Sequence, residues 1–428
     1  MRYLSTAIFL VFFIFNVVSA QSSNVINQVL VGESGGAALN LSGAETVFVS
    51  RSSLTGGNGD VNPVTNTDKS GGAGLISENG SVTVESSVLQ GGAGGVLGVD
   101  TVAPQIVNGG HGLIHTDESS QILLEGLFTG GFGGSASNSF GSVNAHGGNG
   151  VEITQAFGDG AASLEIDGGE YRGGTGGNAL LNNATDPNIY DLTYLNIGGA
   201  HGGHGVRYTR LDQEPLNDRL IINNGIYLGG DGGIASNLST ARITAQGGSG
   251  IFIDYADVTI NGGFFAGGVA GAVNGELGIE GAGVHAQDAN VTINGGDFKA
   301  VGLRFDVRYY DVESIINDGI FDSVNYTTFY DDFFETYDRH LTANINGGII
   351  TNMTISGETY SHLTITDGTV VNELTISGTG SNMVSAFGTT VIGDLSISGA
   401  TKNTFSLADT VSSSGRVTIQ DGTTDVNA

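Results

Sequence analysis

Side chains that could bind a sugar or move a proton recur at one position of a repeated motif in the middle of the chain. The motif is Gly-Gly-x-Gly-aliphatic, and if the aliphatic residue points into a core, the next residue points outward. On the last three repeats this rule places seven residues on one face: Phe252, Asp254, His285, Gln287, Arg304, Asp306 and Arg308. Arginine can hold a carboxylate through two hydrogen bonds, and histidine or aspartate can exchange a proton with a ring carbon or a glycosidic oxygen. This face is therefore a candidate for binding an acidic sugar.

A stretch without repeats follows directly, near 309–340, and is rich in aromatic and acidic residues. It ends in Tyr337-Asp338-Arg339-His340, and we add Tyr337, Asp338 and His340 to the candidate glycan-binding face. A second interpretation treats the whole cluster as a solvated face followed by an insertion that covers a change of coil size. The residue pattern favours this second interpretation.

The elements that must position these residues follow from two interleaved repeats. The Gly-Gly-x-Gly-aliphatic motif occurs at Gly71–Leu75, Gly109–Leu113, Gly147–Val151, Gly202–Val206 and Gly247–Ile251, so its copies begin 38 to 55 residues apart. A second motif, an aliphatic residue followed by polar residues, glycine and a large apolar residue, occurs at Ile166–Tyr171, Ile222–Tyr227, Ile260–Phe265, Ile293–Phe298 and Ile316–Phe321. Repeats of this length are typical of solenoids.

The second motif predicts a corner between two strands in every coil. Its aliphatic residue and the residue five places on would point into the core, while Gly, Asn and Asp adopt the left-handed backbone that a sharp corner needs. Stacked coils would align six rings in one internal column: Phe128, Tyr171, Tyr227, Phe265, Phe298 and Phe321. Because these rings alternate with polar positions, we interpret them as core residues and not as a sugar-stacking ladder.

The repeats predict an all-β fold, a right-handed parallel β-helix with wider coils at about 35–300 and slimmer coils at about 344–428. The slimmer coils follow from a shorter period, since Ile345, Ile355, Ile365 and Ile376 recur every ten or eleven residues. We divide the chain into residues 1–20, a Gly-rich β-helix at 21–343 that includes the insertion near 309–340, and a short-period continuation of the same β-helix at 344–428.

Composition and charge exclude several classes of protein. The 428 residues include 73 Gly, 4 Pro and no Cys, which excludes collagen and a disulfide scaffold. A formal charge of −29 argues against nucleic acid as a partner. Residues 1–20 have the layout of a secretory signal peptide, so we expect a secreted, extracellular protein with no membrane span after its removal. We expect no cofactor and no metal site, although clustered aspartates leave loose Ca²⁺ binding open.

The alternation of the two motifs over about residues 35–350 resembles Gly-rich right-handed β-helical surface proteins of the autotransporter-passenger type. More broadly it resembles the pectin-lyase-like β-helix superfamily. The resemblance implies the architecture but not the function, because adhesins, phage tailspikes, polysaccharide lyases, hydrolases and epimerases share this fold. Glycan hydrolases of the superfamily carry Gly-His-Gly and paired aspartates, and this chain has His111 and His204 between glycines and an Asp331-Asp332 pair.

We interpret these histidines as fillers of a variable position, because the middle residue of the glycine motif is also Ala, Asn or Ser in other copies. A metal-binding pair of His201 and His204 has no carboxylate at a matching short spacing. Binding of ice or of a crystal surface is a further hypothesis, since Thr354, Thr364, Thr366 and Thr375 recur near the corners. The sequence argues against it, because these threonines are mixed with Ser, Glu and His.

The leading hypothesis from the sequence is an extracellular structural or adhesive β-solenoid protein without an evident catalytic motif. Its partners would be polysaccharides or cell-surface components. The alternative is a carbohydrate-active enzyme, a polysaccharide lyase, hydrolase or epimerase acting on acidic glycans, with the face around His285, Arg304 and Asp306 as its site.

Overall fold

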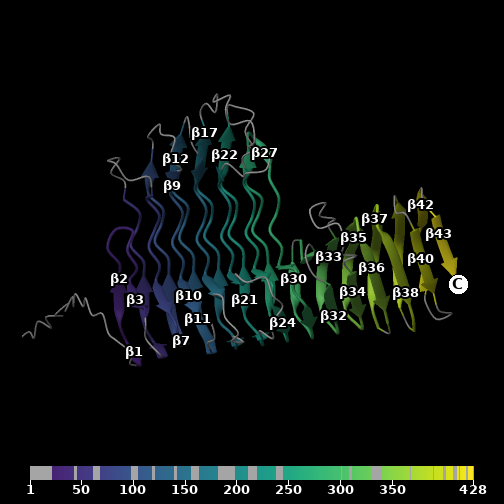
Figure 1. Ribbon diagram of the computed structural model, residues 1–428, viewed down its shortest axis with the longest axis horizontal. Coiled ribbons are helices and arrows are strands. Elements are labelled where there is room, and N and C mark those ends of the chain that lie inside the picture. Colours follow the sequence, from purple (N-terminus) through teal and green to yellow (C-terminus); the bar gives the residue numbers. More distant parts are fainter. Residues whose placement is uncertain are drawn as a thin grey trace, which may run out of the picture.

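The computed structural model shows a stack of parallel strands along one axis (Figure 1). It describes residues 22–42, 46–60, 68–97, 105–117, 121–138, 142–155, 163–181, 198–210, 219–237, 244–299, 301–307, 311–328, 340–366, 368–388, 390–398, 402–407, 412–413, 415–420 and 423–427. All regular elements among these residues are strands, and no helix there is long and apolar enough to span a membrane. The prediction of an all-β parallel β-helix is confirmed.

Each wide coil contributes one strand to each of three faces. The first face contains β3 (Leu39–Ser42), β6 (Leu75–Glu78), β10 (Leu113–Asp117), β14 (Val151–Gln155), β19 (Val206–Arg210), β23 (Ile251–Asp254), β28 (Val284–Gln287) and β31 (Leu303–Val307). The second contains β1 (Ser23–Ile26), β4 (Thr46–Ser50), β15 (Ser163–Ile166), β20 (Arg219–Ile222), β24 (Asp257–Ile260), β29 (Val291–Ile293) and β32 (Val312–Ile316). The third contains β2 (Val29–Val31), β5 (Ser53–Thr55), β16 (Glu170–Arg172), β21 (Ile226–Leu228), β25 (Phe264–Ala266) and β30 (Asp297–Lys299), while β7 (Ser81–Gln90) and β11 (Gln121–Thr129) run from the second face into the third.

The slim coils merge the third face with the first. The strand β33 pairs with β30 at one end and with β31 at the other, and the same merged strand recurs in the next coils. The merged strands are β33 (Ile320–Thr328), β35 (Ile349–Gly357), β37 (Val370–Gly378) and β39 (Val391–Ser398), followed by β41 (Ser412–Ser413) and β42 (Val417–Gln420). The second face continues as β34 (His340–Ile345), β36 (Tyr360–Ile365), β38 (Ser381–Ala386), β40 (Lys402–Leu407) and β43 (Thr423–Asn427).

One hydrophobic core runs along the axis, and the predicted aromatic column lies inside it. Five successive pairs of rings stack nearly parallel with centroids 4.5 to 5.0 Å apart, from Phe128 through Tyr171 to Phe321. All six side chains have no measurable exposure, and the Tyr171 hydroxyl donates to the Gly168 carbonyl at 2.9 Å. The column therefore belongs to the core and presents no ring to a sugar.

At the corners of the second motif, the predicted role of asparagine was wrong, although Asn27 and Asn79 do have a positive φ at other corners. The left-handed position is taken by the last glycine of the motif, with φ of 125° at Gly263 and 129° at Gly296, and Asn261 is not among the residues with positive φ. The Asn261 amide instead donates to the Asn223 amide oxygen of the previous coil at 2.8 Å, and Asn294 donates in turn to Asn261 at 2.8 Å. Because one glycine already makes the turn, asparagine is free to bridge neighbouring coils.

The long Gly-rich arcs rise from the third face into an upper lobe, which stands above the N-terminal coils in Figure 1 and ends at β27. Its strands are β8 (Val96–Leu97), β9 (Gln105–Ile106), β12 (Ser135–Asn138), β13 (Val143–Asn144), β17 (Asn178–Leu181), β18 (Gly198–Gly199), β22 (Ile234–Asn237), β26 (Ala272–Val273) and β27 (Glu276–Leu277). A second, separate core of small residues fills it: Leu97, Val107, Ala136, Val143, Ala145, Ala179, Leu181, Ala200, Ala235 and Ala245.

Two glycine segments per coil connect the two cores, and we call them together the glycine waist. The outgoing segments include Gly91–Gly95, Gly130–Gly134, Gly173–Gly177 and Gly229–Gly233, and the returning ones are the Gly-Gly-x-Gly motifs. Outgoing and returning segments alternate along the axis, and one hydrogen bond of 2.8 to 2.9 Å joins each segment to the one before it. Gly131 N of an outgoing segment donates to Gly110 O of a returning segment, and Gly148 N of the next returning segment donates to Gly131 O. A Cβ atom on most of these glycines would overlap a neighbouring carbonyl oxygen. The waist therefore requires glycine to let the backbones pack.

Candidate functional site

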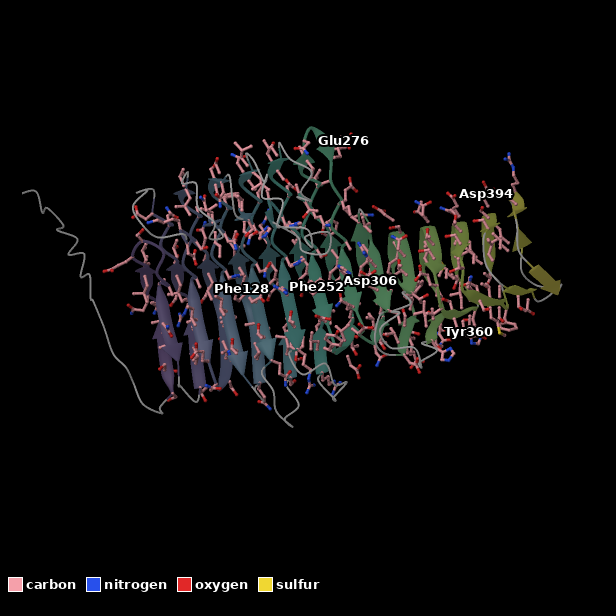
Figure 2. The ribbon with its side chains drawn as sticks, turned by 45° about the horizontal axis from the view of Figure 1, so that its top comes forward. Phe128, Phe252, Glu276, Asp306, Tyr360 and Asp394 are labelled. Carbon is pink, nitrogen blue, oxygen red and sulfur yellow. The ribbon has the colours of Figure 1, made fainter. Side chains whose placement is uncertain are left out.

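The candidate residues sit at equivalent positions of neighbouring strands on the first face. Register pairs Phe252 of β23 with His285 of β28, and His285 with Arg304 of β31. The adjacent outward column pairs Asp254 with Gln287 and Gln287 with Asp306. The two columns predicted from the glycine motif therefore exist, and their residues lie on neighbouring coils, as Figure 2 shows for Phe252 and, further along the axis, Asp306.

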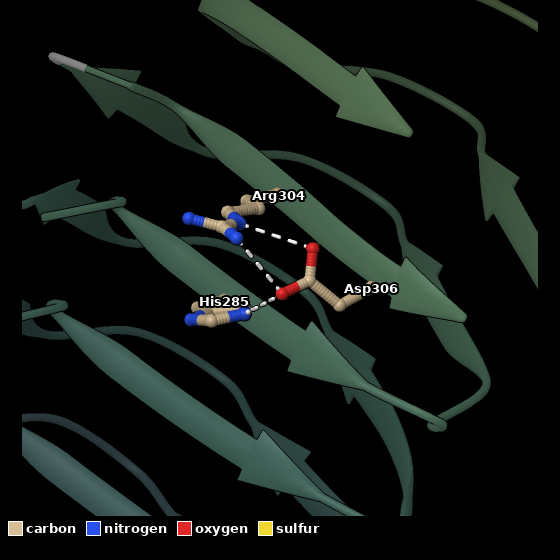
Figure 3. A network of polar contacts seen from close by, with 3 residues as sticks. All are labelled: His285, Arg304 and Asp306. Atoms are coloured by element: carbon tan, nitrogen blue, oxygen red, sulfur yellow. Dashed lines mark hydrogen bonds and ion pairs between the residues drawn. The ribbon is translucent and has the colours of Figure 1, made fainter. Parts of the chain in front are cut away.

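His285, Arg304 and Asp306 form one polar cluster (Figure 3). The Asp306 carboxylate accepts hydrogen bonds from Arg304 Nε at 3.1 Å and from Arg304 Nη2 at 3.0 Å, and it lies 3.0 Å from His285 Nε2. The side chains are 17% exposed for His285, 34% for Arg304 and 0% for Asp306. The cluster thus presents a cation and an imidazole to solvent above a buried carboxylate.

The sequence predicted Asp306 as an outward residue that contacts the ligand, but its side chain is buried. Burial alone would raise the pKa of this carboxyl group, but the hydrogen bonds and charges of His285 and Arg304 outweigh burial and leave the pKa below its usual value. The carboxylate is therefore held in its charged form under its two partners. In this position it orients Arg304 and His285 and does not itself reach solvent.

The row extends further along the first face than the sequence-based set. The Phe252 ring lies edge-on to His285 with centroids 5.0 Å apart, and the Arg207 guanidinium lies over its face, 5.7 Å from the centroid. Arg207 Nη1 in turn lies 3.5 Å from a carboxylate oxygen of Glu152. Five rungs from β14 to β31 thus carry one continuous row of charged and aromatic side chains, which we call the charged row: Glu152, Arg207, Phe252, His285 and Arg304.

Glu152 and Arg207 were not among the predicted site residues, although the same register rule places them two coils and one coil before Phe252. Glu152 is largely buried, and its burial raises the pKa of the carboxyl group against the opposing effects of Arg207 and of the Asn149 amide. A carboxyl group with a raised pKa beside a cation is a feature of many acid–base sites. The charged row therefore holds one buried carboxyl group with a raised pKa and two arginines able to bind an anion.

The histidines between glycines have a different task. The Nδ1 atom of His111 accepts the backbone N–H of Asn149 at 3.0 Å, and the Nδ1 atom of His204 accepts the backbone N–H of Ser249 at 2.9 Å. Asn149 does the same with its amide oxygen toward His204 N at 2.6 Å. Burial, with a contribution from the charge of Arg207, lowers the pKa of His111 to about 4 and that of His204 to about 3. Each ring is a neutral acceptor that links two coils.

A second ladder runs through the residue before the double glycine. His146 Nδ1 accepts the N–H of His201 at 3.0 Å, and His201 Nδ1 accepts the N–H of Gln246 at 3.2 Å. The other ring nitrogen of His201 lies 2.9 Å from the Thr244 hydroxyl, so both nitrogens of His201 are engaged. Within the described residues, no three His, Cys, Asp or Glu side chains are grouped as a metal ion would need.

Of the remaining predicted residues, the structure describes only His340. Arg308, Tyr337 and Asp338 lie outside the described residues, as do Asp331 and Asp332. His340 begins β34 on the second face, is exposed, and packs edge-on against the Tyr360 ring with centroids 5.1 Å apart.

Comparisons with protein families, curated proteins and solved structures find no match to this chain.

Acidification is expected to destabilise the protein through the histidine ladders. The unfolded histidines titrate near pH ~6.5, whereas burial lowers the folded pKa of His204 to about 3. The unfolded state therefore binds more protons in this interval, so the stabilisation is complete above the unfolded pKa and is lost as the pH falls toward the folded one. Urea unfolding at a series of pH values measures this decline.

A pair of variants isolates the contribution of one ring. His204→Asn keeps an acceptor, as Asn149 does one coil earlier, and is expected to weaken the pH dependence while stability at neutral pH stays close to that of the parent. His204→Ala removes the acceptor and is expected to lower the free energy of unfolding by about 1 kcal/mol or more even at neutral pH. Equal pH dependence in the parent and His204→Asn would contradict this account.

Proposed function

We propose that this chain is an extracellular structural or adhesive solenoid, of the kind its glycine motifs resemble in autotransporter-type surface proteins. The observation that carries the proposal is that the polar residues of its repeats form hydrogen bonds between neighbouring coils. The histidines of the glycine motifs accept backbone N–H groups, and the corner asparagines bond to one another from coil to coil. Such ladders fix the coils to each other and leave these groups unavailable for proton transfer.

The charged row supplies the adhesive part of the proposal. Arg207 and Arg304 are 41% and 34% exposed, and both are held by a carboxylate, which restricts their rotamers before any ligand arrives. An arginine pre-organised in this way binds an anionic group at a reduced entropic cost. We therefore propose an acidic polysaccharide or another anionic cell-surface component as the partner, and an N-terminal signal peptide as the route of export.

A carbohydrate-active enzyme is the second candidate, and one observation favours it. Glu152, whose pKa is raised by burial, lies beside Arg207, and the partly exposed ring of His285 lies beside Arg304. A lyase, hydrolase or epimerase acting on an acidic glycan needs a titratable side chain next to a cation that holds the sugar carboxylate, and the row offers this combination at each end.

The two candidates are separated by measuring binding and product formation on the same samples. The mature protein is screened against acidic polysaccharides with and without Ca²⁺, on a glycan array and by release of new chain ends. Structural or adhesive function predicts binding without turnover, weakened at least ~10-fold by Arg304→Ala, because a charge-assisted contact of about 1.5–3 kcal/mol is lost. Arg172→Ala serves as the control, since Arg172 is exposed on the third face and pairs with Glu170.

Turnover that disappears in Glu152→Gln and His285→Ala would establish the enzyme and remove the structural proposal. Binding that is equal in the parent, Arg304→Ala and Arg172→Ala would remove the charged row as the adhesive surface.

A further inference from the structure

The merged strands of the slim coils carry a regular array of small hydroxyl side chains on their outer face. Register pairs Thr354 with Thr375 and Thr375 with Ser396, and two residues further along each strand it pairs Ser356 with Ser377. Ser398 follows Ser396 at the same spacing on β39. We call these six residues the hydroxyl array: Thr354, Ser356, Thr375, Ser377, Ser396 and Ser398.

The spacing of the array follows from the β-helix itself. Neighbouring strands lie ~4.8 Å apart and residues two apart on one strand lie ~6.7 Å apart. Between the two columns, Ile355, Ile376 and Ile397 point inward and are buried in the core, which anchors each strand from behind. No register shift occurs between these strands across the array, so the hydroxyl groups repeat in two directions.

The six hydroxyl groups are accessible and unused. All six side chains are half-buried, and within the described part of the chain none of them takes part in a hydrogen bond. This contrasts with the corner asparagines and the glycine-motif histidines, whose polar atoms bond from coil to coil. A hydroxyl group can both donate and accept, so each position of the array can stand in for a water molecule.

The composition of the array argues against two ligand classes, sugars and polyanions. A sugar surface is usually bound by aromatic rings and a polyanion by basic side chains, and the array contains neither. The neighbouring outward column holds Asn352, Glu373 and Asp394, all exposed, so carboxylates border the array on one side and lie outside it. Small hydroxyl side chains in a two-dimensional repeat fit an ordered lattice of water better than a flexible chain.

From this arrangement we propose that the hydroxyl array binds ice. The sequence-based argument against this activity grouped Thr364 with Thr354 and Thr375, but Thr364 lies on β36 of the second face, where it pairs with Asn344 and Ser385. Without it, the first-face columns contain neither Glu nor His over three successive strands, and their Ser residues carry the same hydroxyl group as Thr. The inference does not depend on the proposed function, because it concerns other residues and another ligand.

The test compares two threonine-to-tyrosine substitutions, one inside the hydroxyl array and one on the second face. Thermal hysteresis and inhibition of ice recrystallisation are measured on the purified mature protein, together with its partition into a slowly growing ice front. The parent is expected to depress the freezing point below the melting point, and Thr375→Tyr, which places a bulky ring in the middle of the array, is expected to abolish the effect. Thr364→Tyr, on the second face, is expected to retain it.

Circular dichroism and urea unfolding establish that both variants keep the fold, and Ser377→Tyr provides a second disruption of the array if Thr375→Tyr does not fold. Absence of hysteresis, of recrystallisation inhibition and of partition into ice in the parent overturns the proposal. Equal loss in the first-face and second-face variants also overturns it. Retention on insoluble cellulose or chitin without any effect on ice would assign the array to a crystalline polysaccharide instead, and would equally reject the proposal.

Discussion

Replacing Gly148 with alanine is expected to lower the free energy of unfolding by about 3–5 kcal/mol. Gly148 lies in the glycine waist, where its N–H donates to Gly131 O at 2.9 Å and its carbonyl accepts from Gly174 N at 2.8 Å. A Cβ atom there would overlap the carbonyl oxygen of Gly110. Because the obstructing atom is backbone and is itself hydrogen-bonded, the clash is relieved only by moving a segment, and this breaks both bonds of Gly148.

The matched control is Gly168→Ala at a corner of the second face, where no atom lies within 4 Å of the added Cβ. We expect this variant to unfold within about 1 kcal/mol of the parent. Urea unfolding followed by circular dichroism gives the two midpoints, and hydrogen exchange shows which coils lose protection. Since coils contact mainly their neighbours, the loss should centre on the coils next to Gly148. A midpoint unchanged by Gly148→Ala would show that the waist is not closely packed.

Phe265→Ala is expected to cost about 3–5 kcal/mol, as for other buried aromatic residues replaced by alanine. The Phe265 ring is fully buried and stacks on Tyr227 at 4.8 Å and on Phe298 at 4.7 Å, so its removal leaves a cavity between two rings. Parallel strands at a fixed spacing hold the coils on either side in place, and the cavity can collapse only in part.

Its neighbour in the sequence provides the control. Phe264 has the same side chain on the same strand but points outward and is 36% exposed. We expect Phe264→Ala to change the free energy of unfolding by less than about 1 kcal/mol. Urea midpoints of the two variants, measured side by side, test the assignment of inward and outward positions, and equal losses would contradict it.

The sequence predicts the strands and corners of this protein well because the pattern of neighbouring residues determines each of them. An inward aliphatic residue and a large apolar residue five places on recur along the wide coils, so pairs such as Ile260 and Phe265 suffice to place the core. The glycine waist could not be predicted in the same way. The residue that excludes a side chain at Gly148 is Gly110, one coil away, and a glycine segment has no pattern of its own that identifies its partner.

The candidate site was predictable in position but not in detail. Alternation of inward and outward residues placed Arg304 beside His285, as the register shows. It could not show that Asp306 lies buried beneath them, because the burial of an outward residue depends on the size of its neighbours in other coils. Nor could it reveal that His204 accepts a backbone N–H, since the donor at Ser249 is 45 residues away.

The alternating hydrogen bonds of the glycine waist also limit how this chain can change length during evolution. Each outgoing segment bonds to the returning segments of two coils, so gain or loss of half a coil would place two outgoing or two returning segments in succession. Duplications and deletions are therefore tolerated as whole coils, or as insertions at the far end of the upper lobe. In the 55-residue interval between Gly147 and Gly202, most of the extra length falls in the sequence between β17 and β18, two strands of the upper lobe. Families built on such a waist should differ in number of coils and in the length of these distal segments, while the spacing within each glycine motif stays constant.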